Sequence, residues 1–154
     1  MNKNLKIDET DRAIIHILQG DGRRSFADIA AELKLAPSTV QQRTNRLIES
    51  GVLKIRGVTD NEIMGINVTA NIAIKADGTR LRQVADEIAK FPEVSYVVIC
   101  TGTYDLLIEV GCRDNDHLLS LLSDKLAKVK GVREMETFVY LRIVKNTYQW
   151  GLTE

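Results

Sequence analysis

The segment from Ser25 to Gly51 constrains the fold of this chain most, because its apolar residues predict two short helices joined by a tight corner. In each half the residues that would form a core recur three and four positions apart, the spacing of one buried helix face. They are Phe26, Ile29, Ala30 and Leu33 in the first half, and Val40, Thr44, Leu47 and Ile48 in the second. Two helices around such a corner are typical of a helix-turn-helix unit.

The second of these helices is polar on the side opposite its apolar stripe. Successive residues turn by roughly 100° along a helix, which gathers side chains that hydrogen-bond well on one face. They are Ser38, Thr39, Gln42, Asn45 and Arg46, with Glu49 at the far end. An ordinary solvated helix also has a polar face. However, a helix that is buried on one side and rich in donors on the other suits the major groove of DNA, and we predict that this one binds there.

Local signals place a further helix and a possible strand around this pair. A first helix is expected from about Asp8 to Gln19, with Asp8 as its N-cap and the acidic Asp11 suited to the positive end of the helix dipole. Ser25, followed by Asp28, predicts a weakened capping box at the start of the next helix. Pro37 suits the first turn of the second helix of the pair, which is called the recognition helix below, and Gly51 suits its end. Alternation over residues 52–56 predicts a short basic strand or wing. The DNA-binding domain is therefore expected to cover residues 1–60.

The distribution of charge favours a nucleic-acid partner, although the 154-residue chain is balanced overall with 21 basic and 21 acidic residues. Residues 34–56 carry five basic side chains and one acidic side chain. This segment has the local positive charge that a phosphate backbone requires.

Residues 61–154 have the periodicity of a second domain. Strand-like segments at 67–76, 94–101, 104–112 and 132–144 alternate with helical segments at 79–91 and after Asp114. The order βαββαβ predicts a ferredoxin-like sheet with both helices on one face, so the whole chain is expected to be α+β. The other face would expose Val, Ile and Tyr side chains in a monomer, which predicts homodimerisation through this domain. The aromatic residues Tyr148 and Trp150 leave it open whether the tail docks on a neighbour or stays loose.

Several classes of protein are disfavoured by what the chain lacks. No apolar run approaches the ~20 residues of a membrane span, and the N-terminus lacks the apolar core of a signal peptide, so a cytoplasmic protein without a membrane partner is expected. Cys100 and Cys112 are expected to be buried thiols in strands. His16 and His117 have no neighbouring nucleophile, and no phosphate loop, dinucleotide motif or paired-histidine metal motif is present. We therefore expect no enzyme activity, no cofactor and no metal.

This order of domains resembles the Lrp/AsnC (leucine-responsive/asparagine-responsive, or feast/famine) family of transcription regulators. The matching residues extend over nearly the whole chain. They are Asp11-Arg12 and Asp21-Gly22-Arg23 near the start, Arg43, Arg46, Leu47, Gly51 and Val52 around the recognition helix, Gly102, Tyr104 and Asp105 in a G-x-x-D hairpin, and Gly131-Val132, Thr137 and Lys145 at the closing strand. One departure is Ala36, where family members usually carry a serine that caps the recognition helix; losing such a cap typically costs about 1 kcal/mol.

The resemblance implies a regulator that dimerises, commonly assembles further into an octamer, and binds an amino-acid effector near the hairpin. Its alternative is an amino-acid-sensing oligomeric module without specific DNA binding. For the hairpin itself, a plain turn is the other interpretation, since Gly permits a tight bend and Asp satisfies local N–H groups. As an effector site, Asp105 would accept from the ligand's ammonium group and backbone N–H groups around Gly102 would receive its carboxylate. Tyr104 would form a wall, with Thr101 and Thr137 as neighbours.

The DNA contacts expected from the sequence fall into two groups. Side chains near the start of the recognition helix reach base edges or the groove: Ser38, Thr39 and Gln42, the last suited to adenine. Phosphate contacts come from later or flanking positions: Arg43 and Arg46 on the helix, and Lys54 and Arg56 on the wing. Arg46 has guanine as an alternative target.

Overall fold

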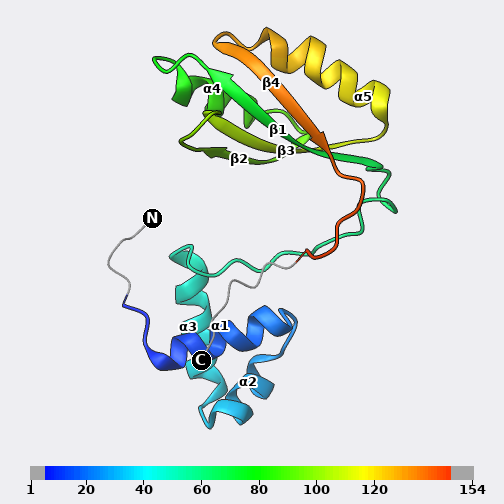
Figure 1. The fold of residues 1–154 in the computed structure, drawn as a ribbon. Coiled ribbons are helices and arrows are strands. Elements are labelled where there is room, and N and C mark those ends of the chain that lie inside the picture. The colour runs from blue at the N-terminus through cyan, green and yellow to red at the C-terminus, as the bar shows by residue number, and fades with distance from the viewer. Residues whose placement is uncertain (1–5, 147–154) are drawn as a thin grey trace. The chain divides into compact units, whose positions relative to one another are not determined.

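A computed structural model describes residues 6–146, which divide into two compact units (Figure 1). The first unit runs up to Val58 and the second from Thr59 to Val144, while Lys145 and Asn146 go with the first. Tyr148 and Trp150, and with them the expectations for the tail, lie outside the described residues.

The first unit consists of three helices: α1 (Glu9–Gly20), α2 (Phe26–Leu33) and α3 (Pro37–Glu49). Their shared core confirms the predicted apolar stripes except at Ile48, which is 42% exposed. Its buried residues are Ile14, Leu18, Ile29, Ala30, Val40, Leu47 and Leu53. The predicted N-caps of α1 and α2 are also confirmed: Asp8 and Ser25 each accept a hydrogen bond from the backbone N–H three residues later. The corner before α3 is made by Lys34, which adopts a left-handed conformation with φ 56°.

The predicted wing is wrong, because residues 52–56 form no strand in the structure. The first unit contains no other described strand with which this segment could pair. Leu53 instead inserts into the helical core, and its N–H donates to the Leu47 carbonyl at 3.0 Å. Lys54 and Arg56, on either side of the half-exposed Ile55, therefore lie on an extended segment that Leu53 anchors to the end of α3.

The second unit is a four-stranded antiparallel sheet in the order β2-β3-β1-β4 (Figure 1). Its strands are β1 (Val68–Ala76), β2 (Val94–Ile99), β3 (Leu106–Cys112) and β4 (Val132–Val139). With the helix α4 (Leu81–Ile88) and the helical segment that begins at α5 (Asn115–Ser120), this gives the predicted βαββαβ order. Both helical segments pack on the same face of the sheet, as expected for a ferredoxin-like fold.

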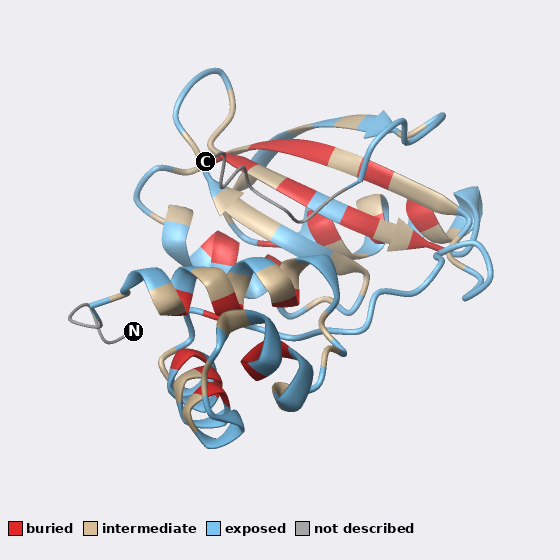
Figure 2. Ribbon diagram, turned by 90° about the horizontal axis from the view of Figure 1, so that it is seen from below, coloured by how far each residue is buried: buried red, intermediate tan, exposed pale blue. Residues whose placement is uncertain are grey.

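Alternation along the two central strands defines the core of this unit. Buried residues recur at every second position of β3 and through most of β1 (Figure 2). This core includes Ile72, Ile74, Leu106 and Ile108 from the sheet and Val84, Ile88, Leu121 and Leu126 from the helical segments that cover it. After α5 the chain continues through a wider π-helical segment, η1 (Leu121–Lys125), and then a tighter 3₁₀ turn, η2 (Leu126–Lys128).

Two boundaries in this unit differ from the sequence prediction. The last strand ends at Val139 rather than Val144, because β1 extends only two residues beyond the point where Ala70 pairs with Val139. Cys112 is a buried thiol in β3 as expected, whereas Cys100 lies one residue beyond β2 and is half-buried. Burial raises the pKa of the Cys112 thiol. Among the described residues, no helix is both long and apolar enough to cross a bilayer, and no cluster of side chains is suited to a metal ion.

Candidate nucleic-acid interface

The face of α3 opposite its buried stripe is open to solvent. Val40, Thr44 and Leu47 are fully buried. Ser38 and Gln42 are exposed on the other side, and Thr39 is half-buried on the flank. Asn45 and Gln41, which were not among the predicted contacts, are exposed as well. The helix therefore presents hydroxyl and amide groups, which can pair with base edges.

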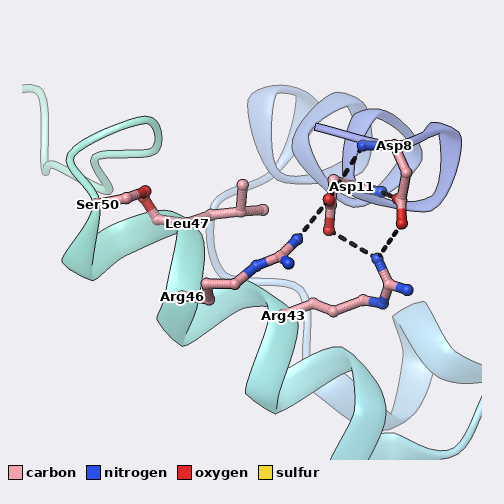
Figure 3. Close-up of polar contacts among 6 residues, drawn as sticks. All are labelled: Asp8, Asp11, Arg43, Arg46, Leu47 and Ser50. Carbon is pink, nitrogen blue, oxygen red and sulfur yellow. Dashed lines mark hydrogen bonds and ion pairs between the residues drawn. The ribbon is translucent and has the colours of Figure 1, made fainter. Parts of the chain in front are cut away.

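Arg43 and Arg46 are engaged with α1 (Figure 3). The Arg43 guanidinium donates to Asp8 at 2.7 Å and to Asp11 at 2.9 Å, and Arg46 donates to Asp11 at 2.5 Å. The side chains of Arg43 and Arg46 remain 29% and 44% exposed, whereas that of Asp11 is fully buried. The two arginines predicted to contact phosphate thus already have carboxylate partners within their own unit.

This cluster combines helix capping with ion pairing. Asp8 and Asp11 form a capping box at the start of α1, each accepting the other's backbone N–H. The hydrogen bond from Arg43 lowers the pKa of Asp8, and the same bond raises the pKa of Arg43. The sequence placed Asp11 in the first turn of α1 but gave no sign that it would be buried, since its partners lie 32 and 35 residues away.

The two basic side chains after α3 are arranged differently. Lys54 and Arg56 are exposed, and neither has a hydrogen-bond or ion-pair partner within residues 6–146. Arg24, by contrast, is paired with Glu32 at 2.6 Å. The positive charges available to an external anion in this part of the molecule therefore include those of the extended segment after α3.

The second predicted site, the β2–β3 hairpin, is a tight turn whose aspartate is already hydrogen-bonded. Gly102 has φ 136°, a conformation that favours glycine, and Thr101 beside it is exposed. Asp105 Oδ2 accepts the Ala76 N–H at 2.9 Å, which ties the start of β3 to the end of β1. The carboxylate therefore satisfies a backbone N–H, as the plain-turn interpretation expects, but on a strand 29 residues away in sequence rather than within the turn.

Tyr104 and Thr137 lie on opposite faces of the sheet. The Tyr104 hydroxyl donates to Glu136, and Lys75 lies 5.8 Å from the centre of its ring. The hydrogen bond to Glu136 raises the pKa of Tyr104. Thr137, however, pairs with the core residue Ile72 in the sheet register and so shares the face that the helices cover. Within one chain the structure does not bring these two predicted effector residues together.

Two family descriptions match the sequence. The family described as the Lrp/AsnC ligand binding domain matches residues 69–150, and the AsnC-type helix-turn-helix domain matches residues 7–48. An uncharacterised HTH-type transcriptional regulator of Pyrococcus abyssi is 38% identical, over 97% of this chain and 93% of its own length. The HTH-type transcriptional regulator FL11 of Pyrococcus furiosus is 34% identical, over 92% of this chain and 93% of its own length.

Solved structures share the fold over nearly the full chain. Escherichia coli AsnC superposes with a TM-score of 0.83 at 24% identity, covering 92% of this chain and 97% of that one. The Neisseria meningitidis transcriptional regulator NMB0573, solved as a complex with L-Met, gives a TM-score of 0.86 at 24% identity, covering 96% and 97%. At this identity the structures establish a common architecture.

Proposed function

Since this chain belongs to the Lrp/AsnC family of transcription regulators, we propose that it binds specific duplex DNA through α3 and changes that binding or its assembly when an amino acid binds. The observation that carries the proposal is the outer face of α3. Ser38 and Gln42 stand exposed on a helix whose opposite side, at Val40 and Leu47, is fully buried. Such a helix can enter the major groove without unfolding its own unit.

We assign base or groove contacts to Ser38, Thr39 and Gln42, and phosphate contacts to Lys54 and Arg56. A glutamine side chain can pair with the N6 and N7 positions of adenine through two hydrogen bonds. The ammonium of Lys54 and the guanidinium of Arg56 have no partner to give up among the described residues. Arg43 and Arg46 differ from them, because their guanidinium groups would have to give up ion pairs with α1 before they could bind phosphate.

The contact assigned to Gln42 can be tested with a duplex selected by the protein from a random library and with a scrambled duplex. Gln42→Ala should weaken binding to the selected duplex by about 5- to 150-fold, the equivalent of about 1–3 kcal/mol, and leave the scrambled duplex unaffected. The matched control is Gln83→Ala, the same change at an exposed position of α4 in the other unit. A Gln42→Ala chain that binds both duplexes like the parent would remove Gln42 from the interface.

The phosphate contacts have a different signature, namely the dependence of affinity on salt. Lys54→Gln and Arg56→Gln should each reduce the slope of log affinity against log salt by about 0.9, and should do so equally for selected and scrambled duplexes. Unchanged slopes would place these side chains away from the DNA backbone. If the parent chain selected no sequence at all, the alternative of a sensing module without specific DNA binding would be favoured.

For the effector we propose an amino acid bound at the β2–β3 hairpin, with Thr101, Gly102, Tyr104, Asp105 and Thr137 as candidate residues. Support comes from the family, and from its Neisseria member solved with L-Met. Because Thr137 and Tyr104 lie on opposite sheet faces, a site that used both would need these residues from different chains. This fits the further proposal that the second domain forms homodimers and, as the resemblance implies, larger assemblies such as octamers.

Calorimetry with each proteinogenic amino acid tests the effector proposal. Asp105→Asn keeps a carbonyl oxygen that can accept the Ala76 N–H but removes the charge that would pair with a ligand ammonium group. We expect it to abolish the binding heat while the fold is retained. Asp105→Ala, which also removes the bond to Ala76, distinguishes loss of charge from loss of structure. Equal heats for the parent and Asp105→Asn would exclude the ammonium contact.

A further inference from the structure

The cluster that joins α1 to α3 contains one fully buried carboxylate, that of Asp11 (Figure 3). Its two oxygens are divided between two arginines: Oδ1 accepts from Arg43 at 2.9 Å and Oδ2 from Arg46 at 2.5 Å. Oδ2 also accepts the Asp8 N–H at 3.2 Å. The Asp8 carboxylate accepts a further hydrogen bond from the Arg43 guanidinium, at 2.7 Å. A buried charge is tolerated when its hydrogen-bonding capacity is used in this way.

The two arginines lie three residues apart on the flank of α3, between its buried and its exposed face. By helix geometry Arg43 and Arg46 point to the same side of α3, about one turn apart along its axis. Two polar contacts at different heights on one flank resist rotation of the helix about its axis, which apolar packing alone resists weakly because it lacks direction. The cluster therefore controls which residues of α3 face outward.

We propose that Asp11 is a positioning residue for DNA recognition: by holding Arg43 and Arg46 it sets the rotation of α3 that presents Ser38, Gln42 and Asn45 to the groove. The proposal rests on DNA binding through α3. It gives the two arginines a role within the protein in place of the phosphate contacts expected from the sequence. Asp11 itself touches no base or phosphate, because its side chain is fully buried.

The positioning role and the phosphate role predict opposite effects of neutralising Asp11. If the arginines served mainly as phosphate contacts, Asp11→Asn would release them and remove a negative charge. Binding to any duplex would then strengthen, and its salt slope would steepen by about 0.9 for each new contact. If Asp11 positions α3, the same variant weakens binding to the selected duplex while the scrambled duplex, which needs no aligned base contacts, is bound no more weakly.

The experiment measures the ratio of affinities for the selected and scrambled duplexes, together with both salt slopes, in the full chain. We expect Asp11→Asn to lower that ratio at least about fivefold, the scale of losing one base contact. The matched control is Asp86→Asn, the same change at an exposed position of α4 in the other unit, which should leave the ratio unchanged. Asp8→Asn is the second variant: asparagine still caps α1, while the charge that holds Arg43 is lost.

The outcomes separate this proposal from the proposed function. A parent chain that does not prefer the selected duplex contradicts DNA recognition itself. A parent that prefers it, with Asp11→Asn retaining the ratio or raising affinity for both duplexes, overturns the positioning role of Asp11. If Asp11→Asn does not fold by circular dichroism, Asp8→Asn decides, since its partly exposed carboxylate can be neutralised without burying an unpaired charge. A lowered ratio in that variant supports the proposal.

Discussion

Ala36 leaves α3 without a side-chain cap, as the sequence predicted. It occupies the N-cap position with φ −78° and ψ 141°, and makes no side-chain hydrogen bond to the first turn. Serine is favoured in this conformation and has an oxygen that can accept one of the unpaired N–H groups. We expect Ala36→Ser to stabilise α3 by about 1 kcal/mol, which would slow hydrogen exchange of its amides about fivefold in the intact chain.

The control for this substitution is Ala31→Ser, the same change at an exposed position inside α2. It adds no cap and should leave exchange in α3 as it is. If the amides of α3 exchanged as fast in Ala36→Ser as in the parent chain, the packing of Pro37 and its neighbours would already provide the stabilisation expected from the cap.

Residues whose role depends on local sequence could be predicted, and those that depend on distant partners could not. Asp8 and Ser25 were identified as N-caps, because the signal lies within a few residues. Asp11 was assigned to the helix dipole, since neither its burial nor its bonds to Arg43 and Arg46 can be inferred without the packing of α1 against α3. Phosphate contact was therefore the natural expectation for these arginines.

At the scale of elements, a buried ion cluster ties the start of β2 to the helical segment after β3. Glu93 Oε1 accepts from Lys125 Nζ at 2.6 Å and contacts His117 Nε2 at 3.1 Å. The Glu93 side chain is only 8% exposed. Burial by itself would raise the pKa of Glu93, but the hydrogen bonds from Lys125, from the backbone N–H of Glu93 and from His117 outweigh it and lower this pKa from 4.5 to about 2.

This pKa predicts a loss of stability in acid. Between pH 4.5 and about 2 the unfolded chain holds a proton on Glu93 that the folded chain does not. The contribution of Glu93 to the free energy of unfolding is therefore complete above pH 4.5, the pKa of Glu93 in the unfolded chain, and decreases as the pH falls toward 2. Its full size is on the order of 3 kcal/mol. In urea unfolding, the difference in stability between the parent and Glu93→Gln should be smaller at about pH 3 than at about pH 6.

Lys125→Met tests whether the ammonium causes this effect. It removes the strongest hydrogen bond to Glu93. The difference in the free energy of unfolding between the parent and Lys125→Met should therefore also be smaller in acid. A difference between the parent and Glu93→Gln that is the same at both pH values would show that the carboxylate does not titrate abnormally in the folded chain.

The order of elements was predictable because hydrophobic periodicity is local, whereas their ends depend on pairing partners. All four strands and the three N-terminal helices occur where the sequence indicated. The predicted wing at 52–56 and the extension of β4 to Val144 are absent, since alternation alone does not provide a neighbouring strand. The π-helical turn Leu121–Lys125, whose last residue binds Glu93, has no local sequence signature.

At the scale of the whole molecule, the uncovered face of the sheet is mixed rather than uniformly apolar. Strand register gives it two groups of side chains. The apolar ones are Ala73, Tyr96, Val98, Leu107 and Phe138, and the charged ones are Lys75, Glu109, Glu134 and Glu136. Tyr96 and Phe138 are 57% and 49% exposed. Three glutamates and one lysine give this face a net charge of −2. A two-fold interface would therefore bring two apolar patches and two like charges together.

This composition predicts how the proposed dimer responds to salt. Screening of the glutamates should strengthen association as salt is added, whereas the same salt weakens DNA binding. Size-exclusion chromatography with light scattering should show a dimer or a larger species. Phe138→Glu, which replaces a large exposed apolar side chain of this face on the edge strand β4 by a further charge, should weaken association at least about tenfold, equal to about 1.4 kcal/mol.

The helix-covered side of the same unit provides the control. Leu119 on α5 is 62% exposed, so Leu119→Glu makes the same kind of change to an exposed apolar residue away from the open face. It should leave the dimer intact. If Leu119→Glu dissociates the protein and Phe138→Glu does not, the subunits associate through the helices. A parent chain that remains monomeric at micromolar concentration in both low and high salt would exclude a stable dimer, and an effector site assembled from two chains would then have no structural basis.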